Sequence, residues 1–550
     1  MTLIALRGAV KSFGARRVLD GLDLEVSDNA RLGLVGANGS GKSTLLRILA
    51  GLEHPDSAPA VRRRELTTAF LPQLVTADTR SPRAILAAAR PELAEVEREL
   101  DEVTAQLADP AVHADLDRMG RVLRRQERLL ARFDELDGHA FEGRSQAMLE
   151  SLGLTAAEID RPAAELSGGQ RKLTALAACL IAEPDLLLLD EPETHLDAVR
   201  RSLLEELVDD HKGAVVMVSH DRYLLDEAVT EIAELEFGRV RMWPGNYSAY
   251  AAARELALAR QQEQWDAQQK EIERLQDAIR RYRQWASMVD DRRHTIRARN
   301  TQRRIDRMDK VDRPVLERRK IGLALRSGMR GGKRVVDLRS ADVGFDGQAV
   351  LEDVALTVFR GERVGVIGAN GSGKSCLVRT IAGDLPTVAG ERWVGPSIRV
   401  GYLAQEHSPG SSTDTPVDVL RRQKPCSDEE AVSALLRFLF SYEQSRQPLR
   451  SLSGGERTRL ELLLLMRGGA NLLVLDEPTN HLDIDSVEML EAALERFDGT
   501  AIISSHDRYM LDRIADRTVV VAGGRAQAFE GGYSDWYSRS QETATASSGR

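Results

Sequence analysis

The sequence lacks the features of a membrane or exported protein. It has no run of roughly 18 or more apolar residues, which a membrane-spanning helix requires. The stretch from Met1 to Val10 has no basic region followed by a long apolar segment, so no secretory signal is expected. Cys179, Cys376 and Cys426 do not have metal-ligand spacing, which excludes a cysteine-bound iron–sulfur cluster and fits a reducing cytoplasm.

The composition is that of a folded chain. Of 550 residues, 42% are hydrophobic and 29% are charged, and the formal net charge is −9. Such a chain is too apolar, and too weakly charged overall, to remain disordered. At about 150 residues per domain, the length predicts roughly two to four domains.

One module occurs twice along the chain. GANGSGKST at Gly36–Thr44 returns as GANGSGKSC at Gly368–Cys376, 332 positions later. The later motifs LSGGQ, LLLLDEP and SHDRYLLD return as LSGGE, LLVLDEP and SHDRYMLD, and the two copies of each are 286 positions apart. The first copy therefore carries 46 additional residues, which lie between Gln73 and Ser167.

The additional residues predict a helical arm at about 80–150. Apolar residues recur there at spacings of three and four, with a turn near Pro110. The arm either packs on its own domain as a coiled coil or contacts a partner. The expected apolar stripe consists of Leu93, Val96, Leu100, Val103 and Leu107 before the turn, and of Met119, Leu123, Leu130 and Phe133 after it.

A basic linker, residues 253–333, joins the two copies. Leu258, Trp265, Ile272 and Ile279 are seven apart, and Leu275 and Tyr282 fill the second seam position. With a second stretch carrying Ile305, Met308 and Val311, this pattern predicts an antiparallel coiled-coil hairpin whose tip lies near Trp285–Asp291. Arg254 to Arg334 holds 23 Lys and Arg against 12 Asp and Glu, a net charge of +11, which leaves −20 for the rest of the chain.

The pattern GxxxxGK[ST] points to phosphate chemistry. Both copies follow an apolar stretch and precede a helix-like run, which is the strand–loop–helix context that a phosphate-binding loop needs. Glycines allow backbone N–H groups to face phosphates at a helix N-terminus. Lys42 and Lys374 are expected to reach the β- and γ-phosphates of ATP, and Ser43 and Ser375 to place a hydroxyl on Mg²⁺. A glycine-rich turn without function does not explain two matches in a repeat.

Acidic pairs end a second apolar strand in each copy. Asp190 and Asp476 follow four aliphatic residues, at the strand end where ligands lie in α/β sheets. Each aspartate is a candidate Mg²⁺ ligand, and Glu191 and Glu477 are candidate general bases for the attacking water. The alternative is an acidic pair in a solvated turn.

His220 and His506 follow another apolar strand. A histidine there is often a surface residue, but its repetition favours a role in orienting water at the γ-phosphate. Gln73 and Gln405 also hold equivalent places in the repeat.

These motifs together resemble the ABC ATPases, and the resemblance covers nearly the whole chain. It implies an α/β fold with two ABC-type P-loop ATPase domains, each with a β-subdomain and a helical subdomain, joined by an α-helical antiparallel coiled-coil linker. It also implies a head-to-tail sandwich in which the signature of one half caps the ATP of the other. Phe13 and Phe345 match the aromatic that stacks on adenine, with core packing as the alternative.

The resemblance assigns three sets of residues. The ATP-binding set is Gly36, Asn38, Gly39, Gly41, Lys42, Ser43, Thr44, Gly368, Asn370, Gly371, Gly373, Lys374, Ser375, Cys376, Phe13, Phe345, Gln73, Gln405, Ser167, Gly168, Gly169, Gln170, Ser453, Gly454, Gly455 and Glu456. The Mg²⁺ set is Ser43, Gln73, Asp190, Ser375, Gln405 and Asp476. The catalytic set is Glu191, Glu477, His220 and His506.

Within the ABC ATPases the chain resembles the ABC-F proteins. Both halves share one polypeptide, a charged helical linker joins them, and EPTNHLD at Glu477–Asp483 is the family's form of that region. The resemblance implies a cytoplasmic monomer that binds the ribosome (rRNA, with E-site tRNA as a further candidate) and modulates translation or protects it from antibiotics. The linker arginines would contact RNA phosphates, and Trp285 or His294 would stack on a base. These arginines are Arg292, Arg293, Arg297, Arg299, Arg303 and Arg304.

Two departures and several alternatives accompany this interpretation. The first half reads EPETHLD, so Glu193 and Thr194 replace the usual threonine and asparagine, while His195 and Asp197 remain. Cys376 replaces a threonine. The alternatives are a solvated spacer in place of an RNA-binding linker, a DNA-branch-binding ABC-F ATPase, the ATPase subunit of a membrane transporter, and a scaffold with inactive sites. The expected domains are 1–252, 253–333 and 334–540, followed by a disordered tail at 541–550.

Overall fold

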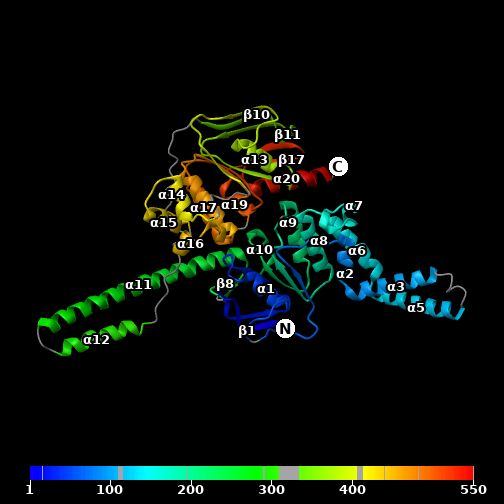
Figure 1. Cartoon of the computed structure of the whole chain (residues 1–550), viewed down its shortest axis with the longest axis horizontal. Helices are drawn as coiled ribbons and strands as arrows, with labels where there is room; N and C mark the ends of the chain where they lie inside the picture. The colour runs from blue at the N-terminus through cyan, green and yellow to red at the C-terminus, as the bar shows by residue number, and fades with distance from the viewer. Residues whose placement is uncertain are drawn as a thin grey trace.

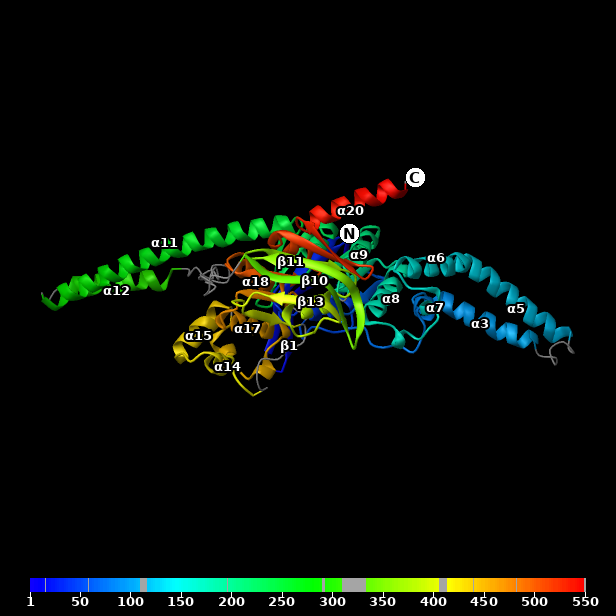
Figure 2. The same cartoon turned by 90° about the horizontal axis from the view of Figure 1, so that it is seen from above.

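The computed structural model describes residues 1–14, 16–57, 59–108, 116–194, 196–288, 292–308, 333–404, 413–438, 440–480 and 482–548. Two halves of the same architecture lie against each other, and two helical hairpins project from them in different directions (Figures 1 and 2).

Each half contains a six-stranded sheet and a smaller three-stranded antiparallel sheet, as the resemblance implied. The six-stranded sheet of the first half has the order β5-β6-β7-β3-β8-β9, in which only β9 is antiparallel. Its strands are β3 (Arg31–Val35), β5 (Thr68–Leu71), β6 (Leu186–Asp190), β7 (Ala214–Val218), β8 (Glu231–Glu236) and β9 (Arg239–Pro244). The smaller sheet has the order β2-β1-β4, with β1 (Thr2–Phe13), β2 (Arg16–Ser27) and β4 (Val61–Arg62).

The second half repeats this arrangement. Its large sheet has the order β14-β15-β16-β12-β17-β18, and its small sheet the order β11-β10-β13. The strands are β10 (Arg334–Phe345), β11 (Gln348–Phe359), β12 (Arg363–Gly368), β13 (Ala389–Val394), β14 (Val400–Leu403), β15 (Leu472–Asp476), β16 (Thr500–Ser504), β17 (Arg517–Ala522) and β18 (Arg525–Glu530). Every residue of β6, β7, β15 and β16 is buried, because a parallel sheet is covered on both faces.

Helices in equivalent places surround the two sheets. The paired helices are α1 (Lys42–Ala50) and α13 (Lys374–Ala382), α8 (Gly168–Ile181) and α17 (Gly454–Arg467), α9 (Ala198–Asp209) and α18 (Ile484–Glu495), and α10 (Arg222–Ala228) and α19 (Arg508–Ile514). The other helices of the bodies are α2 (Pro82–Ala88), α6 (Gly138–Ser151), α7 (Ala156–Ile159), α14 (Pro416–Gln423), α15 (Asp428–Arg437) and α16 (Tyr442–Arg446). No helix in the described part of the chain is long and apolar enough to cross a membrane.

The arm of the first half is formed by α3 (Pro91–Ala108) and α5 (Leu116–Glu135). The two helices lie side by side and project from the body (Figures 1 and 2). The apolar stripe predicted for α3 is correct. The prediction that Leu123 and Leu130 belong to the stripe of α5 is wrong, because these side chains are 44% and 45% exposed. Val122 and Leu129 are buried instead, since the stripe after Met119 begins with a step of three residues rather than four.

The linker forms the predicted antiparallel hairpin. Helix α11 (Tyr247–Met288) continues directly out of the first half, and α12 (Arg292–Asp306) returns alongside it (Figure 1). The seam residues Leu275 and Ile279 are buried, as their heptad positions predict. Val311 lies outside the described residues. At the other end of the chain, α20 (Tyr533–Ser548) extends beyond residue 540 into the segment that was expected to be disordered.

Buried ion pairs join the two halves in a crossed arrangement. Arg222 of α10 pairs with Glu491 of α18, and these side chains are 2% and 0% exposed. In the mirrored place Arg508 of α19 pairs with Glu205 of α9. The two arginines are 286 positions apart, as are the two glutamates, so the interface has the pseudo-twofold symmetry of the repeat.

We expect the Arg222–Glu491 pair to be strongly coupled. Arg222→Met or Glu491→Leu alone would lower the free energy of unfolding by about 1.5–3 kcal/mol. Each substitution removes the nearest partner of a buried charge that keeps only a longer contact, at 3.4 Å for Arg222 and 3.1 Å for Glu491. The double variant would cost far less than the sum, which denaturant titrations of the four proteins would measure. For the exposed Arg98–Glu102 pair of the arm, single substitutions would cost only about 0.5 kcal/mol or less. Additive costs at Arg222 and Glu491 would contradict the coupling.

Candidate nucleotide-binding and hydrolysis site

The phosphate-binding loops join β3 to α1 and β12 to α13. Gly41 and Gly373 precede the helices with φ angles of 108° and 104°, in a region that side chains rarely tolerate. A Cβ atom on Gly41 would lie 2.4 Å from Val18 Cγ1, so the turn also lacks space for a side chain. Neither helix N-terminus is capped by a side chain, which leaves its N–H groups available to an anion.

The loop lysines point back into their own loops. Lys42 Nζ donates to the carbonyl oxygens of Gly36 at 2.6 Å and Ala37 at 3.1 Å. Lys374 makes the same pair of bonds, at 2.9 and 3.0 Å, to Gly368 and Ala369. Burial lowers the pKa of both ammonium groups, so a phosphate anion would be a favourable additional partner.

The residues expected to hold Mg²⁺ fit that ion. Ser43 hydrogen-bonds Asp190, and Ser375 Oγ donates to Asp476 Oδ1 at 3.3 Å. Burial raises the pKa of both aspartates, and Asp190 Oδ1 is buried with no hydrogen-bond partner in the described part of the chain, so a divalent cation would stabilise the ionised carboxylate. Mg²⁺ keeps several waters and typically binds one or two protein oxygens plus substrate phosphates.

Gln73 and Gln405 were expected beside the metal. Gln73 Nε2 donates to Glu191 Oε2 at 2.9 Å, so it reaches the candidate base of its own half. Gln405 lies outside the described residues, as does His195.

The candidate bases share an unusual backbone conformation. Glu191 and Glu477 have φ angles of 48° and 50°, in the left-handed region that costs non-glycine residues free energy and is common at functional sites. Their N–H groups donate to the carbonyl oxygens of Val218 and Ser504 across the sheet, at 2.8 and 2.9 Å. Burial raises the pKa of Glu477 to about 7, which places this carboxylate in the range of a general base.

The two histidines lie next to these carboxylates. His220 Nε2 is 3.7 Å from Glu191 Oε1, and His506 Nε2 is 3.4 Å from Glu477 Oε1. Burial, together with the loop lysine of the same half, lowers their pKa values to about 4 and about 3. Both rings are therefore neutral near pH 7 and suited to orient a water molecule.

The signature motifs begin α8 and α17. Ser167 and Ser453 cap these helices, each in a reciprocal capping box with the residue three positions later. That residue is Gln170 in the first half, which also donates to Glu158 at 2.7 Å, and Glu456 in the second half, which accepts from Gln444 at 2.6 Å. The Gln170 and Glu456 side chains therefore organise the helix start and do not line the cavity.

A cavity of about 1610 Å³ between the halves brings many of the predicted residues together, but Gly36, Gly368, Gly455, Asp190 and Asp476 do not line it. Asn38 N–H donates to Asp483 Oδ2 at 2.9 Å, and Asn370 N–H to Asp197 Oδ2 at 3.4 Å, so each phosphate loop contacts the other half. The predicted residues on its wall are Phe13, Asn38, Gly39, Gly41, Lys42, Ser43, Thr44, Gln73, Ser167, Gly168, Gly169, Glu191, His220, Phe345, Asn370, Gly371, Gly373, Lys374, Ser375, Cys376, Ser453, Gly454, Glu477 and His506.

Phe13 and Phe345 lie at the cavity with 51% and 54% of their surface exposed. This exposure rules out the core-packing alternative and leaves both rings available to stack on a base.

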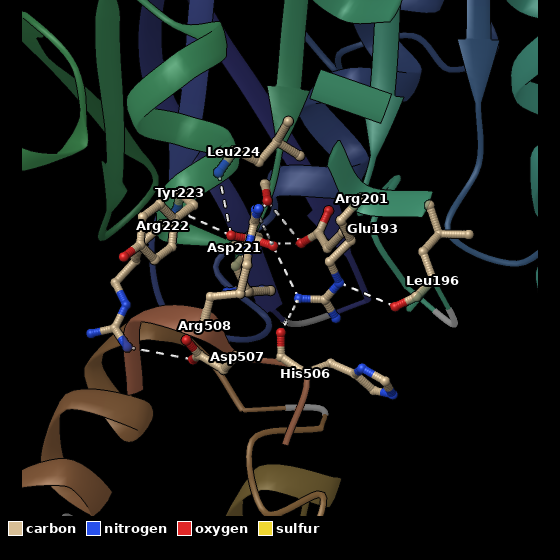
Figure 3. Close-up of polar contacts among 12 residues, drawn as sticks. Glu193, Leu196, Arg201, Asp221, Arg222, Tyr223, Leu224, His506, Asp507 and Arg508 are labelled. Carbon is tan, nitrogen blue, oxygen red and sulfur yellow. Dashed lines mark hydrogen bonds and ion pairs between the residues drawn. The ribbon is translucent and has the colours of Figure 1, made fainter. Parts of the chain in front are cut away.

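Two buried residues of the first half were missed by the sequence analysis. Lys172 on α8 donates to the carbonyl oxygens of Pro72, Gln73 and Asp190 at 2.8, 2.9 and 3.2 Å, and so connects the signature helix to the metal side of the site. Arg201 on α9 reaches from the first half to the second (Figure 3). Comparison of the copies offers a signal, because the equivalent positions hold Thr458 and Val487.

The departure at Glu193 changes the surroundings of His220. Glu193 Oε1 accepts hydrogen bonds from Ser219 Oγ and from the His220 N–H, both at 2.8 Å. Its other oxygen is buried and has no hydrogen-bond partner among the described residues. In the second half, Thr479 and Ser505 share a hydroxyl–hydroxyl bond of 3.1 Å instead. Burial, and next the charge of Asp221, raise the pKa of Glu193 to about 7.

The linker arginines do not take part in this cavity. Arg297, Arg299 and Arg303 are exposed on α12, and Arg304 contacts Glu271 of α11 at 3.3 Å. Arg293 and Trp285 are also exposed, whereas the side chains of Arg292 and His294 lie outside the described set.

Comparison with known proteins places these features in a family context. A model described as ABC transporter matches residues 19–194 and 351–480, and a second model of the same description matches residues 233–323. The chain is 34% identical to the ABC transporter ATP-binding protein YfmR of Bacillus subtilis over 559 residues, covering 98% of this chain and 84% of that protein. It is 32% identical to ABC transporter F family member 5 of Arabidopsis thaliana, with coverage of 98% and 78%.

Solved structures share the fold at low sequence identity. An RNase-L inhibitor structure aligns with a TM-score of 0.61 and 19% identity over 98% of this chain and 93% of that one. A model of ribosome-bound archaeal Pelota and ABCE1 aligns with a TM-score of 0.55 and 19% identity, with coverage of 96% and 78%.

We predict that Glu193→Thr stabilises the protein in a pH-dependent way. The unfolded carboxyl ionises near its ordinary pKa of 4.5, and the folded one near 7. Between these values the folded state holds the extra proton, so burial of Glu193 costs stability as pH rises and the cost is complete above pH 7. Thermal unfolding at pH 8 would show a gain of at most about 3 kcal/mol for the variant, and little gain at pH 4. An equal effect at both pH values would contradict the raised pKa.

Proposed function

The chain belongs to the ABC transporter family, in its F branch of tandem cassettes that hydrolyse ATP, and on this premise we propose that its ATP-bound form binds the ribosome. Binding would modulate translation or protect it from antibiotics, and hydrolysis would release the protein. It would act in the cytoplasm as a monomer, because both composite sites form within one chain.

The observation that carries the proposal is the attachment of the basic hairpin to the interface between the halves. Tyr247, the first residue of α11, donates to Glu488 Oε1 of the second half at 3.0 Å. Arg254, about two turns further along α11, pairs with Asp485 Oδ1 at 2.9 Å and with Glu234 at 2.8 Å. Glu488 and Asp485 lie on α18, which begins directly after Asp483, the residue that contacts the first phosphate loop.

Closure of the halves would therefore set the direction of the hairpin. ATP between the halves would stabilise the contacts of Asp483 and Asp197, and α11 would follow α18 through Tyr247 and Arg254. The far part of the hairpin exposes arginines on α12 that suit phosphate oxygens, and Trp285 near its tip suits stacking on an unpaired base. One structural neighbour, a model of ribosome-bound archaeal Pelota and ABCE1, supports the same class of partner.

Within each site, the residues have separate tasks. The phosphate loop and its lysine would bind the β- and γ-phosphates, and the glutamate would accept the proton of the attacking water. The neutral histidine beside the glutamate would orient that water. Bound Mg²⁺ would neutralise charge on the phosphates, held by the serine and aspartate of the same half.

We expect the Glu191→Gln/Glu477→Gln variant to accumulate on ribosomes in the presence of ATP, because it closes on ATP but does not hydrolyse it. The measurement is co-sedimentation with purified ribosomes, with ATP and without nucleotide. Neutralising Arg297, Arg299, Arg303 and Arg304 to Gln in this background would strongly weaken pelleting, so that it persists only at low salt. In salt titrations it would reduce the slope of log affinity against log salt by about four.

A matched control removes the same charge from the arm. Arg121, Arg124, Arg128 and Arg132 are exposed on α5, and their replacement by Gln would leave ATP-dependent pelleting in place. Equal loss in both variants would show a nonspecific charge effect. A variant that binds ATP but never pellets would reject the ribosome, and retention on branched DNA would then support the DNA-binding alternative.

A further inference from the structure

The two ATP sites are linked to their histidines in different ways. In the second half, the His506 N–H donates to Glu477 Oε2 at 3.2 Å, so the histidine backbone holds the candidate base. In the first half, the His220 N–H donates to Glu193 instead, and the base Glu191 accepts from Gln73. The base of the second site therefore depends on how the backbone at His506 is placed.

Arg201 of the first half holds that backbone from the opposite side. Its Nη1 donates to the His506 carbonyl oxygen at 3.1 Å, across the interface between the halves (Figure 3). The carbonyl and N–H of His506 are thus both engaged, one by Arg201 and one by Glu477. These two bonds restrict rotation at His506 and with it the position of the imidazole, whose Nε2 lies 3.0 Å from Asn370 Oδ1.

Contacts within the first half orient the guanidinium of Arg201 independently of its contact with His506. Nη1 also donates to Asp221 Oδ2 at 3.0 Å, and Nε donates to the Leu196 carbonyl oxygen at 3.1 Å, so two acceptors of the first half orient it (Figure 3). Its side chain is only 13% exposed. Such prior orientation reduces the entropy lost when the contact with the second half forms.

No equivalent contact can form in the mirrored place. Val487 of α18, which lies 286 positions after Arg201, occupies the equivalent position in the second half. The side chain of Val487 has no hydrogen-bonding group. The neighbouring positions do match, since Asp197 and Asp483 both begin their helices and both contact a phosphate loop of the other half. Arg201 and Val487 therefore break a symmetry that the neighbouring aspartates keep.

We propose that Arg201 is a positioning residue for ATP hydrolysis in the second half: through the backbone of His506 it fixes the histidine and Glu477, while the first site works without such a residue. The inference rests on the proposed roles of His506 and Glu477. It implies that the second site is completed by the first half only when the halves are closed, beyond the contribution of the signature motif.

Single-site backgrounds test this directly in the full chain. Glu191→Gln leaves the second site as the hydrolytic one, and Glu477→Gln leaves the first. In the Glu191→Gln background, Arg201→Met is expected to lower kcat about tenfold, the worth of one hydrogen bond from a charged donor, while KM for ATP stays within about twofold. Arg201→Lys, which retains a charged donor, would recover part of the loss.

The same substitution in the Glu477→Gln background separates positioning from a purely structural role. Arg201→Met is expected to change kcat there by less than about twofold. Loss of general closure would instead slow both sites, as is expected for Tyr223→Phe, which removes a 2.7 Å bond to Asp512 across the interface. Arg98→Met, on the exposed arm, controls for loss of an arginine.

Two outcomes would overturn the proposal: equal loss of kcat in both backgrounds, or no loss in the Glu191→Gln background. Unfolding midpoints of all variants would show that a lost activity is not a lost fold. A separate measurement tests the assignment of Glu191 and Glu477 as general bases. If that assignment is wrong, the Glu191→Gln/Glu477→Gln protein with Arg201 unchanged would still hydrolyse ATP.

Discussion

The architecture depends on two arginines that are buried between the halves. Arg222 and Arg508 each follow a histidine of the candidate site by two residues, and each pairs with a buried or half-buried glutamate of the opposite half. Each guanidinium also lies over the ring of the tyrosine that follows the other arginine in the sequence. The distance to the ring centre is 4.0 Å from Arg222 to Tyr509 and 4.9 Å from Arg508 to Tyr223. Because a buried charge without its partner is costly, one register of the halves is favoured over others. That register places each phosphate loop against the other half.

Symmetry of the interface makes its exceptions informative. Lys172, Glu193 and Arg201 all belong to the first half, and their counterparts are Thr458, Thr479 and Val487. Each exception forms a hydrogen bond to the backbone of a residue at one of the two sites. Lys172 donates to the Gln73 carbonyl oxygen, Glu193 accepts from the His220 N–H, and Arg201 donates to the His506 carbonyl oxygen. The two sites are thus built from one plan but are chemically inequivalent.

The basic hairpin is attached at the interface between the two halves. Helix α11 is continuous with the first half and bonded to α18 of the second, so it spans the interface at its root. A rigid helix converts a small change at its root into a larger displacement at its tip. The positive charge of the linker and the negative charge of the two bodies separate the proposed nucleic-acid contact from the ATPase core.

Much of this protein is determined by the sequence alone, because the features are local or repeated. Glycine positions define the phosphate loops, strand ends place Asp190 and Glu191, and the heptads of residues 258–282 predict the hairpin. The missed features require surfaces that meet only after folding. The side of α5 that holds Leu123 depends on how the helix restarts after the turn, which no spacing reveals. The contact of Arg201 with His506 joins residues 305 positions apart, and the buried state of Glu193 follows from the sheet around it. Tertiary structure alone decided these, since hydrogen bonds across an interface depend on the packing of both halves.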